Sequence, residues 1–493
     1  MTLPACAPCP VRKEWIITTA RVQDISDASL LSLLHRELGQ IARTATSSTT
    51  TTSSSSSNSN SSAPATVLVE TAGGVHSPTP AGRSQADAYR PLRLPVVLVG
   101  DARLGGISAT VAAFEALHVR GYDVARLVLF ADASFQNESY LDPYFRRLGI
   151  PTSMLPRPPA AQDGGGCDDV AGMREYYATV SSSAAAADLV ADLAARHRQR
   201  IADVTSMPRR AARTIWYPFT QHRRAVSATA IQAIDSACGD YFQTYCPPDT
   251  PPGPGPGLLL QPKFDGTASW WTQGLGHAEP VLALAAAHAA GRYGHVMFPG
   301  AIHAPALELA ELLLARLRNT RLSRAFFSDN GSTGVEVAVK MALRAARLRY
   351  GWPARDPGPD PGIGIVGLRG AYHGDTLGAM DCAEPGPFNA QAEWYRGRGC
   401  WLDFPHVAMR RGVWCVDLPA EIAHHVGRAR LEFSELAHVF DLPTREASGD
   451  GVARGYARYV RRQLEDAVGR HKRRFGALLL EPVVLGAAGM HIA

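Results

Sequence analysis

Apolar residues recur along the first half of the chain in two different patterns of spacing. Within residues 27–41, Leu30, Leu33, Leu34 and Leu38 lie on one stripe at helical spacing, which predicts an amphipathic helix. From residue 67 onward, short apolar runs alternate with helical patterns instead. The predicted elements are strands at 67–70, 95–100 and 125–130, a helix at 108–120, and a further short strand after the turn at 149–151.

The second half repeats the alternation after a long helical stretch at 173–201. A Pro/Gly-rich loop at 246–257 interrupts a pattern typical of a β-hairpin. The predicted elements that follow are helices at 279–293, 304–317 and 332–350 and strands at 324–328, 362–368 and 476–480. Strands that alternate with helices predict the α/β fold class, with a parallel, doubly wound sheet after residue 67.

Two polar or Pro/Gly-rich segments divide the chain. Residues 44–62 are almost entirely Ser, Thr and Asn, which bury too little apolar surface to offset their ordering entropy. A second break lies near residues 156–166. The predicted organisation is an N-terminal segment of uncertain fold at 1–43, a Ser/Thr-rich linker at 44–66, an α/β domain at 67–160, a helical linker at 161–213 and a second α/β domain at 214–493.

Composition narrows the function classes. The 493 residues are 46% hydrophobic and 19% charged, which excludes a wholly disordered or fibrous protein. A net charge of +5 over this length is too weak to indicate a nucleic-acid partner. No run approaches the roughly 20 apolar residues that span a bilayer, so no membrane partner is expected. The eight cysteines are scattered, and the Cys6–Cys9 pair lies in a Pro-rich stretch that we expect to be an unstructured tail.

A carboxylate and two glycines follow the predicted strand at 67–70. Ligands of open α/β sheets bind beyond the carboxyl ends of the strands, where Glu70 lies. A carboxylate there suits a magnesium ion shared with phosphates, and Gly73 and Gly74 let the backbone approach a ligand closely. The pattern alone favours the alternative, a strand-to-loop turn with a surface glutamate.

The run from Glu70 to Pro78, Glu-Thr-Ala-Gly-Gly-Val-His-Ser-Pro, resembles the E-x-A-G-G segment of dethiobiotin synthetase. Residues 96–108 resemble the later strand and R/K-L-G loop of the same family. The resemblance implies ATP and Mg²⁺ as cofactors, with these roles: Glu70 for the metal, Gly73, Gly74, Arg103, Gly105 and Gly106 for the diamino acid substrate, and Asn137 for the nucleotide.

The resemblance is partial, because the family begins with a P-loop. No G-x-x-x-x-G-K-[ST] motif occurs in the printed sequence, and none of its four lysines lies in a Gly-rich turn after a strand. Residues 67–160 are therefore expected to form a partial P-loop-type domain. We expect ATP-dependent carboxylation and ring closure to fail in the chain as written.

A second set of residues is suited to a phosphorylated planar cofactor. Gly331 allows a tight turn, and Ser332 and Thr333 can cap a helix whose free N–H groups attract phosphate. Tyr372, in a Gly-flanked loop, can stack on a planar ring. Ordinary helix capping and a core tyrosine are the alternatives at these two places, and the Trp270-Trp271 pair either walls an apolar slot or packs internally.

Together these segments resemble the class III, fold-type I aminotransferases that use pyridoxal phosphate, and within them the diaminopelargonic acid aminotransferases. The matching runs lie at 215–222, 268–271, 294–298, 328–341, 370–380, 480–483 and 486–490. The implied roles are cofactor binding for Gly331, Ser332, Thr333, Tyr372, His373 and Glu481, and substrate contact for Phe219, Trp270 and Trp271. Bacterial relatives usually have Tyr where this chain has Phe219, which lacks the hydroxyl.

Both resemblances in this order match the fused bifunctional biotin-synthesis enzymes of plants, algae and fungi. The fusion implies transamination of 7-keto-8-aminopelargonate to 7,8-diaminopelargonate with S-adenosylmethionine as donor, then synthetase chemistry on ATP and CO₂. It also implies a homodimer and a mitochondrial location. No clear transit peptide is present.

The aminotransferase family continues past the matching runs to an Asp for the pyridine nitrogen and a Schiff-base Lys, and this chain ends at Ala493. Neither Lys340 nor Lys472 replaces that lysine, so no catalytic residue is assigned and we expect a fragment without transaminase activity. Two alternatives remain: another class III aminotransferase, of the ornithine or GABA type, and a non-catalytic pseudo-enzyme that keeps the fold.

Overall fold

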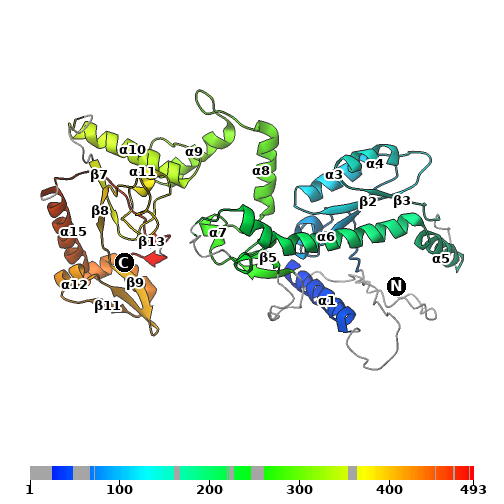
Figure 1. Ribbon diagram of the computed structural model, residues 1–493, viewed down its shortest axis with the longest axis horizontal. Coiled ribbons are helices and arrows are strands. Elements are labelled where there is room, and N and C mark those ends of the chain that lie inside the picture. The colour runs from blue at the N-terminus through cyan, green and yellow to red at the C-terminus, as the bar shows by residue number, and fades with distance from the viewer. Residues whose placement is uncertain are drawn as a thin grey trace. The chain divides into compact units, whose positions relative to one another are not determined.

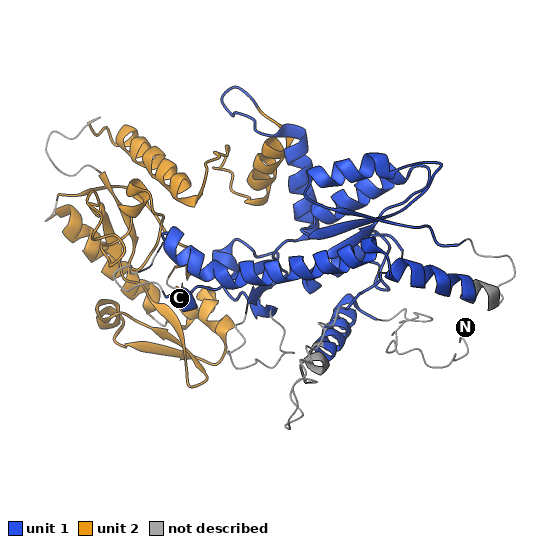
Figure 2. Cartoon of the chain, turned by 45° about the vertical axis from the view of Figure 1, so that its right-hand side comes forward, with its two compact units in different colours: residues 1–301 blue, residues 302–493 orange. Residues whose placement is uncertain are grey.

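The computed structural model divides the chain into two compact units, residues 1–301 and residues 302–493 (Figure 2). It describes residues 25–47, 67–71, 73–159, 167–218, 220, 227–245, 260–353, 363–449, 451–469, 472–487 and 489–493, without the side chains of 42–47 and 167–170. No helix in this described part is long and apolar enough to cross a membrane. Several predictions lie outside the described residues: the Cys6–Cys9 tail, the Ser/Thr run at 44–62 apart from its helical start, Phe219, and the loop at 246–257.

The first unit contains the predicted parallel sheet. Strands β1 (Val96–Val99), β2 (Val124–Phe130) and β3 (Thr152–Leu155) pair in parallel in the order β1-β2-β3. The crossovers are α3 (Gly106–His118) and α4 (Glu138–Arg147), and α6 (Ala184–Thr214) contacts β2 and β3 (Figure 1). Phe114, Leu127 and Phe145 are among the buried side chains that join the sheet to its helices.

The helices of the first unit largely match the predicted ones, except that one predicted helix is divided into two. The amphipathic helix predicted at 27–41 is α1 (Asp27–Ser47), and the short α2 (Gln85–Ala88) and η1 (Arg90–Leu92) precede the sheet. The single helix predicted at 173–201 is instead two helices, α5 (Cys167–Ser181) and α6. The break occurs because the Ser183 hydroxyl accepts a hydrogen bond from the Ala186 N–H at 3.2 Å, which starts a new helix there.

The strand predicted at residues 67–70 is wrong. These residues lie outside any strand, and the Leu68 side chain is 79% exposed. An apolar run becomes a buried strand only when a neighbouring strand satisfies its backbone groups. Among the described strands, β1 pairs with β2 alone, so its outer edge does not take up this segment.

A small antiparallel sheet follows α6 in the first unit. Strands β4 (Ile234–Cys238), β5 (Tyr241–Tyr245) and β6 (Leu260–Phe264) pair in sequence order, and β5 with β6 confirms the predicted hairpin. A four-residue turn, α7 (Ala268–Trp271), and helix α8 (Pro280–Tyr293) come next.

The second unit has a parallel sheet and an antiparallel sheet. Strands β12 (Arg474–Leu478), β7 (Ile363–Leu368) and β8 (Gly399–Leu402) form the parallel sheet in that order. Helices α9 (Ala304–Arg316) and α10 (Gly331–Arg349) precede it in the chain, and the short α11 (Leu377–Met380) follows β7. The strand predicted at 324–328 is wrong: all five residues are exposed, since no described strand pairs with them.

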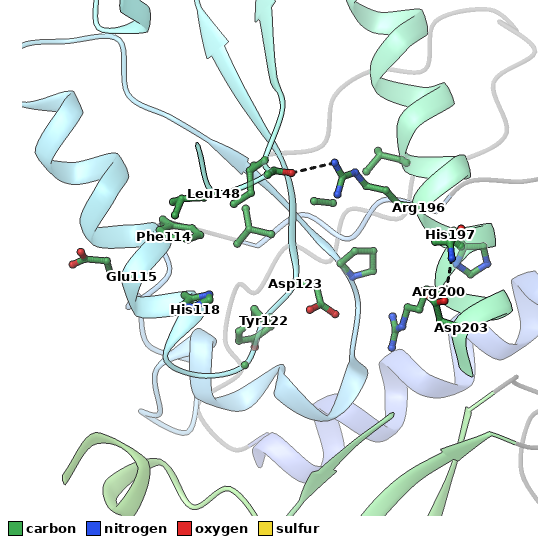
Figure 3. A pocket seen from close by; sticks show the side chains of 18 of the residues that line it. Phe114, Glu115, His118, Tyr122, Asp123, Leu148, Arg196, His197, Arg200 and Asp203 are labelled. Atoms are coloured by element: carbon green, nitrogen blue, oxygen red, sulfur yellow. Dashed lines mark hydrogen bonds between the residues drawn. The ribbon is translucent and has the colours of Figure 1, made fainter. Parts of the chain in front are cut away.

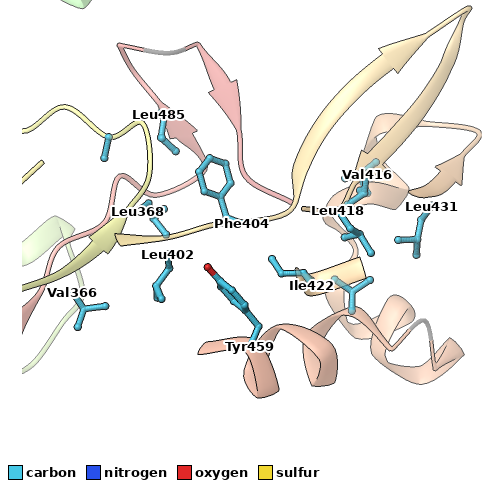
Figure 4. Close-up of a cluster of buried hydrophobic side chains, with 13 residues drawn as sticks. Val366, Leu368, Leu402, Phe404, Val416, Leu418, Ile422, Leu431, Tyr459 and Leu485 are labelled. Carbon is cyan, nitrogen blue, oxygen red and sulfur yellow. The ribbon is translucent and has the colours of Figure 1, made fainter. Parts of the chain in front are cut away.

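The antiparallel sheet of this unit consists of β9 (His406–Arg410), β10 (Val413–Asp417) and β11 (Arg430–Phe433), with β10 in the centre. Its core is continuous with that of the parallel sheet and includes Leu402, Phe404, Val416 and Tyr459 (Figure 4). The remaining elements are α12 (Ala420–Val426), α13 (Leu436–Phe440), α14 (Leu442–Ser448), α15 (Val452–Gly469), β13 (Val484–Leu485) and β14 (Met490–His491).

Candidate functional site

Glu481 joins two segments of the second unit that are more than a hundred residues apart. Its Oε1 accepts a hydrogen bond from the Tyr372 N–H at 3.0 Å, and its Oε2 accepts one from the Gly486 N–H at 2.7 Å. Tyr372 follows β7 and Glu481 follows β12, which are neighbouring parallel strands. The contact therefore lies at the carboxyl edge of the sheet, where α/β folds bind ligands.

The start of α10 meets the same loop. The Ser332 Oγ accepts a hydrogen bond from the Asp375 N–H at 3.0 Å, and the Asp375 carboxylate accepts one from the Tyr372 hydroxyl at 2.8 Å. Ser332, Asp375, Tyr372 and Glu481 thus form one hydrogen-bonded chain. The Ser332 hydroxyl keeps its own hydrogen to donate to an anion in front of the helix.

Gly374 makes this close approach possible. Its φ is +134°, and a Cβ there would lie 2.6 Å from Ser332 Oγ and 2.7 Å from Ser332 Cα. Only glycine fits such a backbone angle and such a distance. Gly331, in contrast, has open space where a Cβ would stand.

Thr333 is already engaged in capping α10. Its backbone N–H donates to the Asn330 Oδ1 at 3.0 Å, and its hydroxyl donates to the Asn330 carbonyl at 3.0 Å. Asn330 and Thr333 therefore form a capping box. For phosphate, the helix start leaves chiefly the backbone N–H groups of Gly331 and Ser332 and the Ser332 hydroxyl.

His373 is buried beside this network, at 8% exposure, and its Nε2 has no hydrogen-bond partner. Burial lowers the pKa of His373, although the Glu481 charge opposes the shift. A neutral imidazole with an unsatisfied buried nitrogen is uncommon and is able to bond a ligand group.

Glu336 and Asp375 were not singled out from the sequence. Glu336 accepts from the Gly378 N–H at 3.2 Å and from the Lys340 ammonium at 2.8 Å, and the Lys340 hydrogen bond is the main reason that the pKa of Glu336 is lowered. The i, i+4 spacing of Glu336 and Lys340 was a visible signal for their ion pair. Asp375 was visible as the last residue of the Tyr-His-Gly-Asp run.

The described lysines do not enter this network. Lys340 pairs with Glu336 on α10, and the Lys263 ammonium donates to the Gln232 Oε1 at 3.1 Å in the first unit. Lys472 is exposed ahead of β12. Of the described lysines in the second unit, Lys340 is thus engaged with Glu336 and Lys472 is exposed to solvent.

Tyr372 provides a spectroscopic test of the network. Burial, together with the hydrogen bond to Asp375, raises the pKa of the Tyr372 hydroxyl to about 12. We expect Asp375→Asn to lower that pKa, because the neutral amide does not repel the phenolate. The measurement is the tyrosinate absorbance during an alkaline titration, with the Tyr372→Phe titration subtracted. An unchanged difference curve in Asp375→Asn would contradict the hydrogen-bonded chain.

The residues predicted for the synthetase site lie in the first unit. Arg103 and Gly105 lie in the loop between β1 and α3, and Gly106 is the first residue of α3, at the carboxyl edge of the sheet. The Asn137 amide donates to the Asp101 carbonyl at 2.9 Å and to the Arg103 carbonyl at 2.8 Å, so it holds this loop in place. A Cβ at Gly106 would lie 2.7 Å from that amide nitrogen, which explains why a glycine stands there.

Glu70, Gly73 and Gly74 lie upstream of that loop in exposed backbone. Gly73 has a φ of +79°, and a Cβ on it would collide with the Ser77 side chain, while Gly74 has open space. Within the described residues, no group of three or more His, Cys, Asp or Glu side chains is arranged to hold a metal ion.

A cavity in the first unit lies at the opposite end of the strands, where they begin (Figure 3). It measures about 860 Å³ and is lined by the start of β2 and by residues that include Phe114, Tyr122 and Arg200. Because it opens at the amino ends of the strands, it is separate from the loop that contains Arg103 and Gly106.

Trp270 and Trp271 also belong to the first unit, where they are 68% and 73% exposed. Both residues have positive φ angles, of 57° and 72°. Left-handed backbone costs about 1–2 kcal/mol for each residue with a Cβ. Much of the surface of both tryptophans is therefore exposed to solvent in this unit.

Two family descriptions match parts of the chain. Residues 27–147 match an AAA domain, and residues 262–392 match aminotransferase class III. The bifunctional dethiobiotin synthetase/adenosylmethionine-8-amino-7-oxononanoate aminotransferase of Emericella nidulans is 51% identical over 427 residues, which are 86% of this chain and 53% of that protein. The bifunctional dethiobiotin synthetase/7,8-diamino-pelargonic acid aminotransferase of Arabidopsis thaliana, named as mitochondrial, is 41% identical over 433 residues, 86% of this chain and 49% of that protein.

The chain is thus similar to these bifunctional enzymes along most of its own length. It spans about half the length of the curated relatives it matches. The adenosylmethionine-8-amino-7-oxononanoate aminotransferase of Synechococcus elongatus is 33% identical over 230 residues, 47% of this chain and 42% of that protein. Among solved structures, an amine transaminase from an uncultivated Pseudomonas species aligns at 20% identity over 55% of this chain and 48% of that one, with a TM-score of 0.38.

The matches agree with the two recognised resemblances and extend the first one. The AAA match begins at residue 27, so α1 belongs to it, although the sequence left residues 1–43 without an assigned fold. The aminotransferase match contains Trp270, Ser332 and Tyr372.

Proposed function

We propose that the chain is part of a biotin-biosynthesis enzyme whose second region transaminates 7-keto-8-aminopelargonate to 7,8-diaminopelargonate, with S-adenosylmethionine as amino donor. The observation that carries this proposal is the 51% identity to a fused enzyme across both regions, in the same order. The tryptophan pair at 270–271, within the aminotransferase match, favours this substrate over the substrates of aminotransferases of the ornithine or GABA type.

Pyridoxal phosphate fits the residues of the second unit. When bound, it supplies the electron sink that transamination requires. The helix start at Gly331 and Ser332 would hold its phosphate, and the Tyr372 ring would lie against its pyridine ring. The unsatisfied His373 Nε2 and the hydroxyl of Ser332 support the fit, because both still have hydrogen-bonding capacity.

The residues of this site have different roles. Glu481 fixes the Tyr372 backbone, and Asp375 fixes its hydroxyl, so the ring is held at both ends. Thr333 supports the phosphate site indirectly, by capping the helix with Asn330. Phe219, Trp270 and Trp271 are proposed to contact the apolar part of the substrate.

For the first region we propose a dethiobiotin synthetase role in the longer protein, with Glu70 as the magnesium ligand and the 103–106 loop at the diamino acid. The Asn137 amide supports that loop, and we propose that it shapes the loop in addition to any contact with the nucleotide. The residues of the printed sequence do not include a P-loop for ATP. A homodimer and a mitochondrial location are further proposals that rest on the relatives.

The chain as printed is expected to bind pyridoxal phosphate without a covalent bond. Lys340 is paired with Glu336 and Lys472 is exposed, so we expect neither of these second-unit lysines to hold an amine at the cofactor aldehyde. After incubation with the cofactor and borohydride, intact-mass analysis is expected to show no stoichiometric adduct in the chain or in a Lys340→Arg control. A single adduct on one lysine of the unmutated chain would overturn this expectation.

Two experiments test the function itself. The genomic DNA that flanks the coding sequence is expected to encode, in frame, a Gly-Lys-Thr loop upstream and an Asp…Lys segment downstream. The gene product with both segments is expected to convert 7-keto-8-aminopelargonate in the presence of S-adenosylmethionine and pyridoxal phosphate. If the longer product lacks this activity, or if no such segments exist, the non-catalytic alternative gains support.

A further inference from the structure

The turn that presents the two tryptophans has an unusual backbone. Four consecutive residues, Ala268, Ser269, Trp270 and Trp271, have φ angles of 46°, 47°, 57° and 72°. Residues with a Cβ avoid this left-handed region, and a run of four is sterically costly. Surrounding contacts must therefore hold the turn in place.

The Asp265 carboxylate supplies several of those contacts. Its Oδ1 accepts from the Thr267 hydroxyl at 2.9 Å, and its Oδ2 accepts from the Ser269 hydroxyl at 2.9 Å. The His277 Nε2 lies 2.9 Å from the same Oδ2. Burial would raise the pKa of Asp265, but these hydrogen bonds, that of His277 foremost, lower it to about 2, so the carboxylate is charged at neutral pH.

His277 fastens this carboxylate to the antiparallel sheet of the first unit. Its backbone exchanges two hydrogen bonds with Gly239, in the turn between β4 and β5, at 2.7 and 3.0 Å. Its ring lies 4.7 Å from that of Phe242 in β5. The backbone and the ring of His277 are thus both held against the β4–β5 hairpin. Because the imidazole also bonds Asp265, it links the two residues that flank the tryptophan turn in the sequence.

We propose that Asp265 and His277 form a positioning pair that holds the left-handed turn and so fixes the orientation of the Trp270 and Trp271 side chains for substrate. This inference rests on the proposed function, in which the tryptophans contact the aliphatic chain of 7-keto-8-aminopelargonate. The pair itself touches no reacting atom. It acts on the affinity for the keto acid, and the affinity for pyridoxal phosphate is independent of it.

A spectroscopic readout tests the pair without any substrate. Two adjacent indoles in fixed orientation couple and give a circular-dichroism couplet, which is obtained by subtracting the spectrum of Trp270→Phe from that of the unmutated chain. We expect Asp265→Asn to lose most of this couplet, because the amide nitrogen cannot accept the hydrogen bonds that Oδ2 accepts. Asp240→Asn, in the neighbouring turn, is the matched control and is expected to keep the couplet.

A rescue variant separates positioning from general stability. Glycine adopts positive φ without strain, so Ala268→Gly in the Asp265→Asn background is expected to restore part of the couplet. If Asp265→Asn does not fold, Ser269→Ala, which removes one donor, is expected to weaken the couplet in a folded chain. A full couplet in a folded Asp265→Asn chain would overturn the inference.

Binding measurements connect the pair to substrate. In the chain loaded with pyridoxal phosphate, Asp265→Asn is expected to raise the Kd for 7-keto-8-aminopelargonate roughly tenfold, the usual consequence of one unmade buried hydrogen bond. The Kd for pyridoxal phosphate is expected to stay the same. If the unmutated chain does not bind the keto acid, the proposed function fails, while the couplet still decides whether the pair holds the turn.

Discussion

Replacing Asp235 by alanine is expected to lower the free energy of unfolding of the first unit by about 3 kcal/mol, as measured by denaturant unfolding of the full chain. The Asp235 side chain is 6% exposed and lies in β4. Its Oδ2 accepts from Arg93 at 2.8 Å, and its Oδ1 accepts from Arg200 of α6 at 3.0 Å. Without the carboxylate, the two partly buried guanidinium groups both lose an ion-pair partner, and Arg93 keeps its ion pair with the exposed Asp123.

The pH dependence of this effect has a definite sign. Burial alone would raise the pKa of Asp235, but the hydrogen bonds and charges of Arg93 and Arg200 hold it below its ordinary value of 3.8. The carboxylate therefore contributes stability above that value, and the contribution is lost as the pH falls through the lowered pKa. The unfolding free energies of the unmutated and Asp235→Ala chains should converge in acid.

The matched control is Asp142→Ala, which removes a carboxylate from an exposed ion pair with Arg146 on α4. Exposed pairs of this spacing contribute about 0.3–0.5 kcal/mol. A loss for Asp235→Ala no larger than that of the control would show that Asp235 does not join β4 and α6 to the segment around Arg93.

Gly374→Ala is expected to weaken the binding of pyridoxal phosphate by roughly 10- to 100-fold. The new Cβ would lie 2.7 Å from the Ser332 Cα, a backbone atom that moves only if the start of α10 moves. The positive φ of Gly374 adds strain to the clash. Both effects displace the helix start from the Tyr372 loop, and the affinity can be measured by fluorescence titration with the cofactor.

Gly386→Ala controls for a glycine change in the same region, because the nearest atom to its Cβ would be 4.0 Å away. It is expected to bind the cofactor as the unmutated chain does. Circular dichroism and the unfolding midpoint distinguish a displaced helix start from a collapsed unit. A folded Gly374→Ala chain with unchanged affinity would refute the role assigned to the Ser332–Asp375 contact.

The sequence predicted best those elements whose pattern is local. The crossovers from β1 through α3 to β2 were visible because alternating apolar periods report the burial of each segment directly. The predictions of strands at 67–70 and 324–328 were wrong for the same reason. A strand forms only if another strand pairs with it, and the sequence of a single segment does not show whether a partner strand is present. Ser332, Tyr372 and Glu481, to which the resemblance gives cofactor-binding roles, are joined by hydrogen bonds through Asp375 in the second unit, because they follow parallel strands or start a helix beside them.

Side-chain contacts made by residues outside recognisable motifs could not be predicted from the sequence. Nothing in the pattern around Asp265 indicates that it accepts from both Ser269 and His277, because that depends on how a turn and a hairpin fold together. The role of Asn137 is similar: its amide was considered as a nucleotide contact, and in the structure it bonds two carbonyls of the 101–103 loop.

The exposed run at residues 67–70 has a consequence for the behaviour of the chain in concentrated solution. Val67, Leu68 and Val69 retain a strong preference for β-structure, and β1 pairs on one side only among the described strands. Each copy thus displays an apolar segment able to add to an unpaired sheet edge, together with such an edge. Edge-to-edge addition between copies would begin here, and a lysine at position 68 is the smallest change that would blunt it.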